Sequence, residues 1–153
     1  MTIHSLGGTA SSNTEDQQQL RILLVEDNPL QQHLTARLLR QLGHAVTTAN
    51  DGFEALSVIQ QCRIDVVIMD CQMPLMDGFE ATRLIKELSV RKNKKIAIIG
   101  VSVSEAADDC FKAGMDDFLR KPLNKQILKA ILSRWIRDKE EKAQRISSEV
   151  TVN

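Results

Sequence analysis

The stretch from Val66 to Lys86, VVIMDCQMPLMDGFEATRLIK, decides the fold. Its first four residues are apolar, which is typical of a short strand buried on both faces of a sheet. Asp70 follows the strand directly, and Asp77 precedes an amphipathic segment, so we expect a helix to begin there. The expected apolar face of that helix is Ala81, Leu84, Ile85 and Leu88. A buried strand that leads through an acidic turn into a helix is typical of a parallel α/β sheet.

The same unit recurs on both sides of this stretch. Further strands are predicted at residues 22–25, 45–48, 96–99 and 117–120. Predicted helices follow residues whose short polar side chains favour helix N-termini, namely Asn28, Asp51, Ser104 and Asn124. Because connections are short and crossovers right-handed, we expect an α/β domain of the flavodoxin-like, doubly wound type. Its five-stranded parallel sheet should have the order 2-1-3-4-5, with five helices.

The first and last helices have recurring apolar residues. In the helix that begins at Pro29, the residues Leu30, Leu34, Leu38 and Leu42 recur every four positions, and we expect them to form its buried face. Gly43 is expected to end this helix. In the last helix the expected apolar face is Ile127, Leu128, Ile131, Leu132, Trp135 and Ile136.

The sequence DGFEA occurs twice, at residues 51–55 and 77–81. An aspartate with a glutamate three residues later is typical of a helix start, where both side chains bind backbone N–H groups. The distance from the preceding strand differs between the copies, so we favour two independent helix starts over a duplicated half-domain.

Composition divides the chain into three regions. Residues 1–19 are rich in Gly, Ser, Thr, Asn and Gln and are expected to be a disordered leader or linker. Residues 20–138 are the predicted domain, and residues 139–153 are a polar C-terminal tail that we expect to fray.

Charge and cysteine content exclude several classes of protein. The 153 residues include 20 basic and 20 acidic side chains, a balance that argues against direct nucleic-acid binding. No apolar run approaches the roughly 18–20 residues needed to cross a bilayer, so no membrane contact is expected, and the N-terminus does not resemble a signal peptide. Cys62, Cys71 and Cys110 show no Cys-x-x-Cys spacing, which favours a reducing, cytoplasmic setting.

Polar side chains follow four of the predicted strands. Glu26 and Asp27 follow the first strand, Asp70 the third, Ser102 the fourth and Lys121 the fifth. Taken alone, each has an ordinary structural explanation, such as a turn or a helix start for the aspartates. In the expected strand order, however, these strand ends are neighbours, so the side chains should converge at one edge of the sheet.

Convergence of these side chains predicts a specific chemistry. Three neighbouring carboxylates repel one another and favour a cation, and oxygen ligands without thiol or imidazole favour Mg²⁺. A carboxylate, a metal ion, a hydroxyl and a lysine are together what phosphoryl transfer requires. Asp70 is then the expected in-line nucleophile.

Residues 20–138 resemble the receiver domain of two-component signalling, the CheY-like family. Five separated stretches support the resemblance and occur in the expected order: ILLVEDNPLQQ, ANDGFEAL, VVIMDCQMPLMDGFEATRLIK, IIGVSVSE and AGMDDFLRKPL. The segments VEDNP, MDCQMPLMDG and FLRKPL are most similar to receivers of hybrid sensor histidine kinases.

The resemblance implies a phosphoacceptor and a metal site. Asp70 is similar to the residue that accepts the phosphoryl group. Asp27 corresponds to a direct Mg²⁺ ligand and Glu26, where many members have Asp, to a ligand through water. Together with Asp70, the backbone carbonyl of Gln72 would complete the protein's share of the metal ligands.

The resemblance also implies a conformational switch. Ser102, where Thr is commoner, and Phe118 resemble the switch hydroxyl and the switch aromatic residue. Lys121 resembles the lysine that contacts the phosphoryl group, and the Lys121–Pro122 bond is expected to be cis. Gly100 and Val101 replace the pair of residues that is more usual before the switch residue, and this replacement is expected to loosen that loop.

The implied function is phosphoryl transfer from a phosphohistidine onto Asp70 with Mg²⁺, followed by a change in a partner-binding surface. The implied partner is a histidine kinase or a histidine phosphotransfer domain. The chain is not expected to be an enzyme in the usual sense, although it would promote its own phosphorylation and dephosphorylation. It would be either a stand-alone receiver or a receiver excised from a larger hybrid kinase, which could be membrane-anchored with this part in the cytoplasm.

Three alternatives differ from this function. A degenerate receiver that acts only as an interaction module is disfavoured by the complete acidic set. A haloacid-dehalogenase-like phosphatase needs a second aspartate where this chain has Gln72. A flavin or nucleotide binder needs a glycine-rich phosphate loop, which the predicted domain does not contain.

The remaining polar residues give weaker indications. His4, His33 and His44 show no ligand spacing and are expected at the surface. Cys71 directly follows Asp70, so its modification could block phosphorylation.

Overall fold

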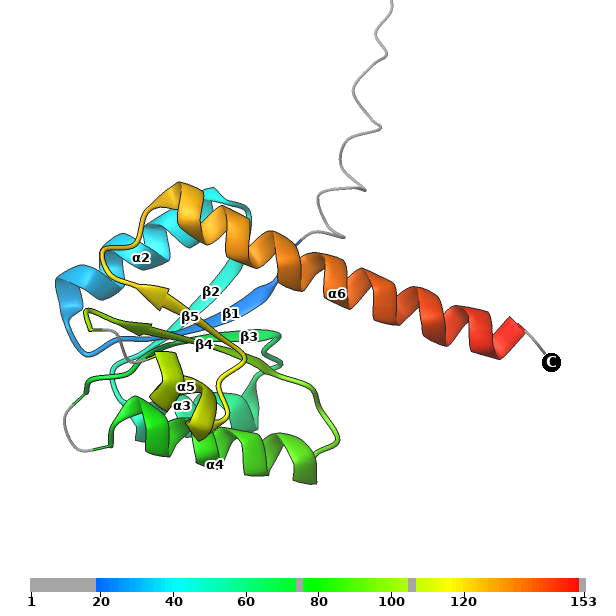
Figure 1. Cartoon of the computed structure of the whole chain (residues 1–153), viewed down its shortest axis with the longest axis horizontal. Coiled ribbons are helices and arrows are strands. Elements are labelled where there is room, and N and C mark those ends of the chain that lie inside the picture. Colours follow the sequence, from blue (N-terminus) through cyan, green and yellow to red (C-terminus); the bar gives the residue numbers. More distant parts are fainter. Residues whose placement is uncertain (1–18, 74–75, 105–106, 152–153) are drawn as a thin grey trace, which may run out of the picture.

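The computed structural model of the chain describes residues 19–73, 76–104 and 107–151. Its centre is a five-stranded sheet in which every paired strand is parallel (Figure 1). The strands are β1 (Arg21–Val25), β2 (Ala45–Ala49), β3 (Val66–Asp70), β4 (Ala97–Ser102) and β5 (Asp117–Arg120). Their order is β2-β1-β3-β4-β5, which confirms the predicted order.

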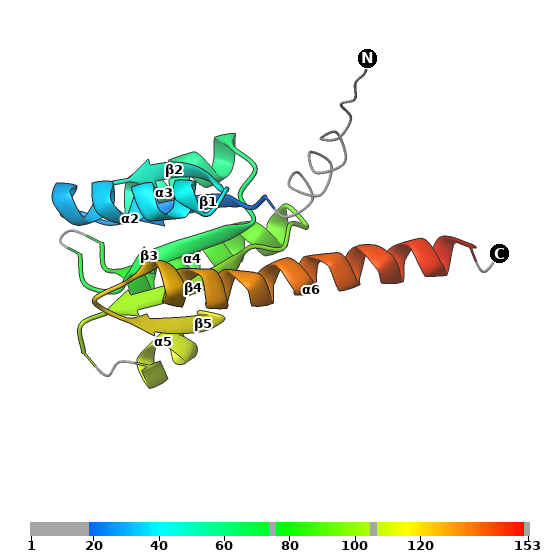
Figure 2. The ribbon, with the colours of Figure 1, turned by 90° about the horizontal axis from the view of Figure 1, so that it is seen from above.

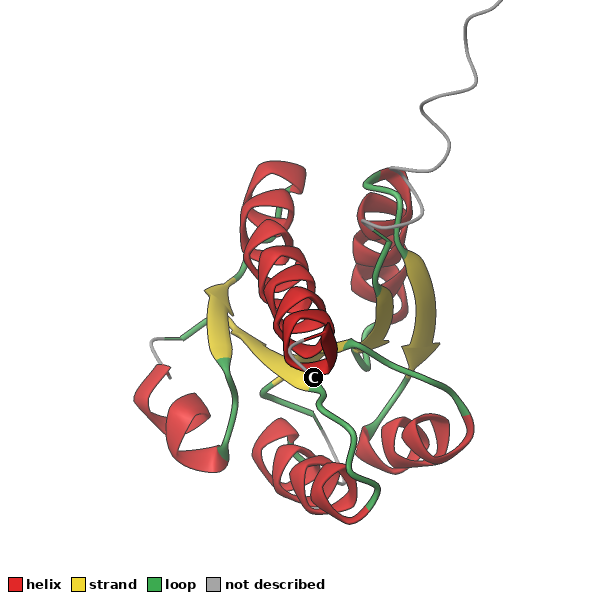
Figure 3. Ribbon diagram, turned by 90° about the vertical axis from the view of Figure 1, so that its right-hand side faces the viewer, coloured by secondary structure: helices red, strands yellow, loops and turns green. Residues whose placement is uncertain are grey.

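Helices cover both faces of this sheet (Figure 3). They are α2 (Pro29–Gln41), α3 (Gly52–Gln61), α4 (Gly78–Arg91), α5 (Ala107–Ala113) and α6 (Lys125–Thr151). Helices α2 and α6 lie on one face, and α3, α4 and α5 lie on the other. Each face has its own cluster of buried apolar side chains, and all of β3 is buried between the two clusters.

Side-chain caps fix the starts of four helices where the sequence predicted them. The Oδ1 atoms of Asn28, Asp51, Asp77 and Asn124 each accept a hydrogen bond from the backbone N–H three residues on, at 2.8–3.0 Å. Gly43 follows the end of α2 with a φ of +96°, a conformation that glycine adopts without strain. The predicted cap Ser104 adjoins residues 105–106, which lie outside the described residues.

The predicted buried face of α2 is right for Leu38 and Leu42, which are partly buried against the apolar cluster, but wrong for Leu30 and Leu34. Leu30 and Leu34 are 66% and 50% exposed, whereas Ala36 and Leu39 are the buried residues of this helix. Because an α-helix has 3.6 residues per turn, positions four apart drift by about 40° per step around the axis. Leu30 and Leu34 have therefore rotated off the face that packs against the sheet.

Helix α6 is longer than the sequence predicted. The polar segment after residue 138, which we expected to fray, is helical to Thr151 and projects beyond the sheet (Figure 2). Lysine, glutamate, arginine and alanine dominate this segment and favour helix. Lys139 also lies 3.4 Å from a carboxylate oxygen of Asp65, which ties the helix to the start of β3. Among the described helices, none is both long and apolar enough to cross a membrane.

His44 is buried, so its predicted surface position is wrong. Its side chain is 8% exposed, and its Nδ1 accepts a hydrogen bond of 3.1 Å from the backbone N–H of Leu20. This hydrogen bond gives the backbone N–H of Leu20, the residue before β1, an acceptor. His33 is exposed as predicted, and His4 lies outside the described residues.

We predict that protonation of His44 destabilises the fold, because burial lowers the pKa of its imidazole. The unfolded chain takes up this proton near pH 6.5, so the free energy of unfolding should fall as the pH drops below about 6.5. His44→Asn keeps a similarly placed acceptor that does not titrate and should remove this part of the pH dependence in urea denaturation. The exposed control His33→Asn should leave it unchanged, and equal slopes for both variants would contradict the prediction.

The repeated DGFEA segments provide a second, internally controlled prediction. A Cβ at Gly78 would contact the carbonyl oxygen of Asp70 and lie 2.9 Å from the Cα of Cys71, both backbone atoms. A Cβ at Gly52 would lie 2.7 Å from the flexible Met76 Sδ. Gly78→Ala should therefore cost about 1–3 kcal/mol of unfolding free energy and Gly52→Ala clearly less. If chemical denaturation gives equal losses of unfolding free energy for the two variants, the prediction is contradicted, because the backbone at Asp70 would then adjust to the new Cβ as readily as the Met76 side chain does.

Candidate functional site

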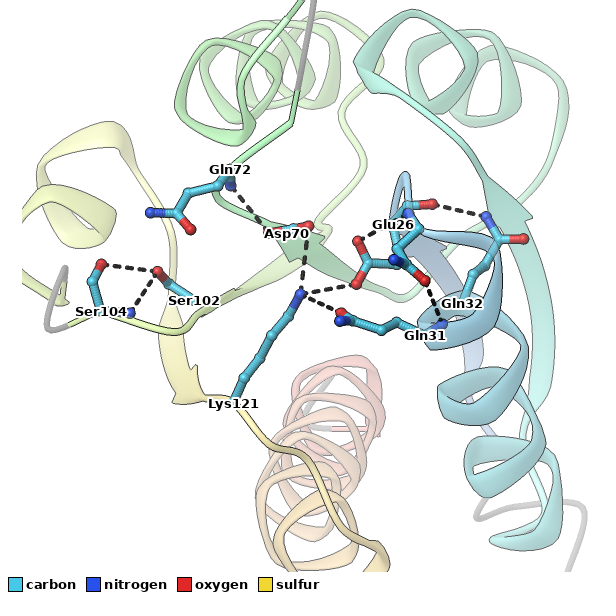
Figure 4. Close-up of polar contacts among 9 residues, drawn as sticks. Glu26, Gln31, Gln32, Asp70, Gln72, Ser102, Ser104 and Lys121 are labelled. Atoms are coloured by element: carbon cyan, nitrogen blue, oxygen red, sulfur yellow. Dashed lines mark hydrogen bonds and ion pairs between the residues drawn. The ribbon is translucent and has the colours of Figure 1, made fainter.

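The carboxyl edge of the sheet brings the predicted acidic residues together, and Figure 4 shows two of them, Glu26 and Asp70, beside Lys121. Glu26 and Asp27 follow β1, and Asp70 is the last residue of β3, the strand paired with β1. One carboxylate oxygen from each of the three lies within 4.8 Å of the others. Glu26 and Asp70 are only 5% and 6% exposed, whereas Asp27 is exposed. The edge is thus an acidic cluster with two buried members and one facing solvent.

Lys121 provides the positive charge of the cluster. It follows β5, and its Nζ lies 2.9 Å from Glu26 Oε1 and 3.6 Å from Asp70 Oδ2. Burial opposes its charge, but the two carboxylates outweigh that effect and raise the pKa of Lys121. The ammonium is therefore held between two strand ends that are far apart in the sequence.

One ammonium does not balance three carboxylates. Burial is the largest influence on Glu26, followed by the nearby Asp70, and together they raise its pKa despite the opposing effect of Lys121. Hard oxygen donors with excess negative charge are the ligands that Mg²⁺ prefers. The cluster therefore has the composition of a magnesium site.

Two glutamines that the sequence analysis missed support this site. Gln31 Oε1 accepts a hydrogen bond of 2.8 Å from Lys121 Nζ. Gln32 Nε2 donates to the backbone carbonyls of Glu26 and Ala49 at 3.0 and 3.2 Å, which joins the ends of β1 and β2. In the sequence, Gln31 and Gln32 are only a pair of glutamines in the first turn of a predicted helix. Such a pair does not differ from ordinary surface glutamines.

Asp70 is oriented by its own backbone neighbourhood. The N–H of Gln72 donates a 3.0 Å hydrogen bond to Asp70 Oδ1, which leaves Oδ2 facing Lys121. The N–H of Cys71 donates to the carbonyl of Val101 at 2.9 Å, so the residue after Asp70 is fastened to β4. The carbonyl of Gln72 as a metal ligand stays a prediction.

Ser102 lies at the same edge but is not engaged with the acidic cluster. Its hydroxyl is 1% exposed, lies 3.0 Å from the Ser104 hydroxyl and accepts a 3.2 Å hydrogen bond from the Ser104 N–H. Its backbone carbonyl accepts a 2.8 Å hydrogen bond from the N–H of Lys121. The Lys121–Pro122 bond is cis, as the resemblance implied.

Phe118 and Gly100 pair in register across β5 and β4. Phe118 is half-buried against the apolar cluster on the side of α3 and α4. A Cβ at Gly100 would lie 3.1 Å from Cys110 Sγ and 3.3 Å from Cys71 Sγ. Gly100 therefore has a packing role, because the missing side chain makes room for sulfur atoms, while the loosening of the loop stays a prediction.

A groove begins at the acidic cluster and runs between α2 and the connection from β5 to α6. Its volume is about 390 Å³. Glu26, Asp70 and Lys121 line one end, and apolar side chains line the rest, among them Leu34, Leu38, Ile68, Val103 and Leu123. The exposed Leu34 thus borders a hollow that leads to Asp70.

Comparison with known proteins agrees with this geometry. A family model described as "Response regulator receiver domain" matches residues 22–133. The sensor histidine kinase RcsC of Salmonella typhimurium is 37% identical over 128 residues, which cover 82% of this chain and 13% of that protein. The hybrid signal transduction protein dokA of Dictyostelium discoideum is 33% identical over 132 residues, 86% of this chain and 8% of that protein. The chain thus spans only a small part of these relatives.

A solved structure shows the same fold with a metal. The receiver domain of the sensor histidine kinase PA1611 from Pseudomonas aeruginosa PAO1 is 39% identical, with a TM-score of 0.68 over 76% of this chain and 97% of that one. That structure has a magnesium ion coordinated in its active site cleft. With the strand order, the acidic cluster and the match over residues 22–133, these findings show that the chain belongs to the response regulator receiver domain family of two-component signalling.

Proposed function

We propose that this chain accepts a phosphoryl group on Asp70 in a phosphorelay, from a phosphohistidine of a histidine kinase or a histidine phosphotransfer domain. The observation that supports this most is the pairing of a nearly buried carboxylate with one ammonium and two further carboxylates at a single edge. Such an edge has a nucleophile, a cation site and a positive group for phosphoryl oxygens within one cluster.

Glu26, Asp27 and Asp70 fit a magnesium ion, with the Gln72 carbonyl as a further ligand. Their oxygens are close enough to share one ion, and the structure places no thiol or imidazole of the described residues in this cluster. Mg²⁺ bound there would neutralise negative charge on the phosphoryl oxygens. The ion would enter from solvent past the exposed Asp27, and the buried Glu26 and Asp70 would hold it at the end of the sheet.

The transfer step uses the side chains as they stand. A carboxylate oxygen of Asp70 attacks phosphorus, an acyl phosphate bond forms, and the phosphorus–nitrogen bond to the donor imidazole breaks. Lys121, 3.6 Å from Asp70 Oδ2, contacts the incoming phosphoryl oxygens. The Ser102 hydroxyl then leaves Ser104 for the phosphoryl group, and Phe118 follows into the space near Ser102. The surface of α5, β5 and α6 changes as a result.

We infer the setting from the relatives and from the cysteines. The relatives that this chain resembles are hybrid kinases, so it would act either alone or as the receiver of a larger kinase. All three cysteines are free thiols, which fits the reducing cytoplasm.

Asp70→Asn should abolish labelling by a radioactive phosphodonor such as acetyl phosphate, because an amide is a poor nucleophile and cannot form the acyl phosphate. Asp77→Asn is the matched control, since asparagine keeps the helix cap seven residues away and should keep the label. Asp27→Asn and chelation of divalent cations should each reduce labelling strongly. Retained labelling of Asp70→Asn would disprove the assignment.

The groove beside Asp70 is the expected docking surface for the donor domain. Leu30, Leu34 and Val103 are 66%, 50% and 61% exposed, and the last two line the groove that ends at Asp70. A donor histidine must approach Asp70 over this rim, and exposed apolar side chains at such a place are typical of a binding surface.

Leu34→Glu should therefore slow transfer from a phosphorylated phosphotransfer domain roughly tenfold, as expected for an interface hot spot. Labelling by acetyl phosphate should be unchanged, because a small donor needs no docking surface. Val90→Glu is the control, since Val90 is 81% exposed on α4, on the opposite face of the sheet. Equal effects of Leu34→Glu on both donors would place Leu34 outside the docking surface.

A further inference from the structure

A pair of thiols lies directly behind the phosphoacceptor. The Sγ atoms of Cys71 and Cys110 are 3.3 Å apart, and the two residues are 2% and 0% exposed. Cys71 follows Asp70 at the end of β3, and Cys110 lies in the middle of α5. The pair therefore links the backbone of the phosphoacceptor to the helix that follows the switch residue Ser102.

The surroundings of the two sulfur atoms leave room for them to approach. Gly100 faces both, with no side chain between them, and a Cβ there would lie 3.1 and 3.3 Å from the two Sγ atoms. A disulfide bond is about 2.05 Å long, so the sulfur atoms must close by roughly 1.3 Å. Gly100 contributes no side chain that could hinder this approach.

We propose that Cys71 and Cys110 are an oxidative modification site that closes to an intramolecular disulfide. The oxidant is a small uncharged peroxide, because burial of both thiols excludes larger reagents. Hydrogen peroxide oxidises one thiol to a sulfenic acid and releases one water. The second thiol then attacks that sulfur, an S–S bond forms and a second water leaves. In total two thiols lose two electrons and two protons, and one peroxide is reduced to two waters.

The disulfide would lock the receiver in its unphosphorylated arrangement; this consequence rests on the proposed function. Cys71 is already held by hydrogen bonds of its N–H to Val101 and of its carbonyl to the Gly78 N–H, at 2.9 and 3.3 Å. A covalent link would add α5 to this fixed backbone. Ser102, which precedes α5, could then no longer leave Ser104 and turn toward the phosphoryl group.

The test uses the full chain with Cys62→Ser, which removes the exposed thiol and with it cross-links between molecules. After peroxide treatment we expect a mass loss of two hydrogen atoms, no thiol that can be alkylated after denaturation, and one cross-linked peptide pair containing Cys71 and Cys110. Labelling of the treated chain by acetyl phosphate should fall roughly tenfold and recover with dithiothreitol.

The controls are Cys110→Ser and Cys110→Ala, each combined with Cys62→Ser. The two replacements differ in polarity, so the test still has a control if one of the variants fails to fold. Both should keep their labelling after mild peroxide treatment. Oxygen added to either thiol without a cross-link would overturn the proposed site, and a cross-linked chain labelled as fast as the reduced chain would overturn the lock. If acetyl phosphate does not label the reduced chain, the proposed function is disproved. The mass of the peroxide-treated chain would still show whether the disulfide forms.

Discussion

Mutual repulsion of Glu26, Asp27 and Asp70 is the constraint on which this structure depends. Their oxygens lie within 4.8 Å of one another, and the only ammonium paired with them among the described residues is that of Lys121, at 2.9 Å from Glu26 and 3.6 Å from Asp70. Removing two carboxylates from water and leaving excess negative charge between them lowers the stability of the folded chain. The same excess favours a cation, so the part of this cost to folding that Lys121 does not offset would be offset by cation binding.

The parallel sheet makes this cluster possible because it brings residues that are far apart in the sequence together at one edge. Glu26 and Lys121 are separated by 95 positions, yet they form a hydrogen bond, since β1, β3, β4 and β5 all end on the same side. Each member of the cluster lies at or just after the end of a strand, so the paired strands of the sheet hold the cluster in place. Gly78 packs directly on the backbone of Asp70 and Cys71, and the Cys71 N–H is bonded to β4. Small backbone shifts there would move the Asp70 carboxylate itself.

Local patterns predicted much of the fold, and long-range contacts explain what they missed. Strand order, helix caps and the acidic convergence follow from apolar runs, short polar residues and the rule that parallel strands end together. The predicted buried face of α2 was wrong at Leu30 and Leu34 because the four leucines repeat every four residues while the helix turns every 3.6. The role of Gln31 and the packing of Gly100 were not predicted for another reason: their neighbours, Lys121 and the sulfur of Cys110, are distant in the sequence or in another element. No local pattern identifies such a partner.

The alternation of side chains along β3 explains how two different sites share one strand end. Ile68 and Asp70 face the side of α2 and α6, where both line the groove, whereas Met69 and Cys71 face the cluster on the side of α3, α4 and α5. Because successive residues of a strand point to opposite faces, the Asp70 carboxylate and the Cys71 thiol are neighbours in sequence but are separated by the sheet. Chemistry at Cys71 can therefore reach Asp70 through the backbone that they share, and the hydrogen bonds of Cys71 to Val101 and Gly78 hold that backbone in place.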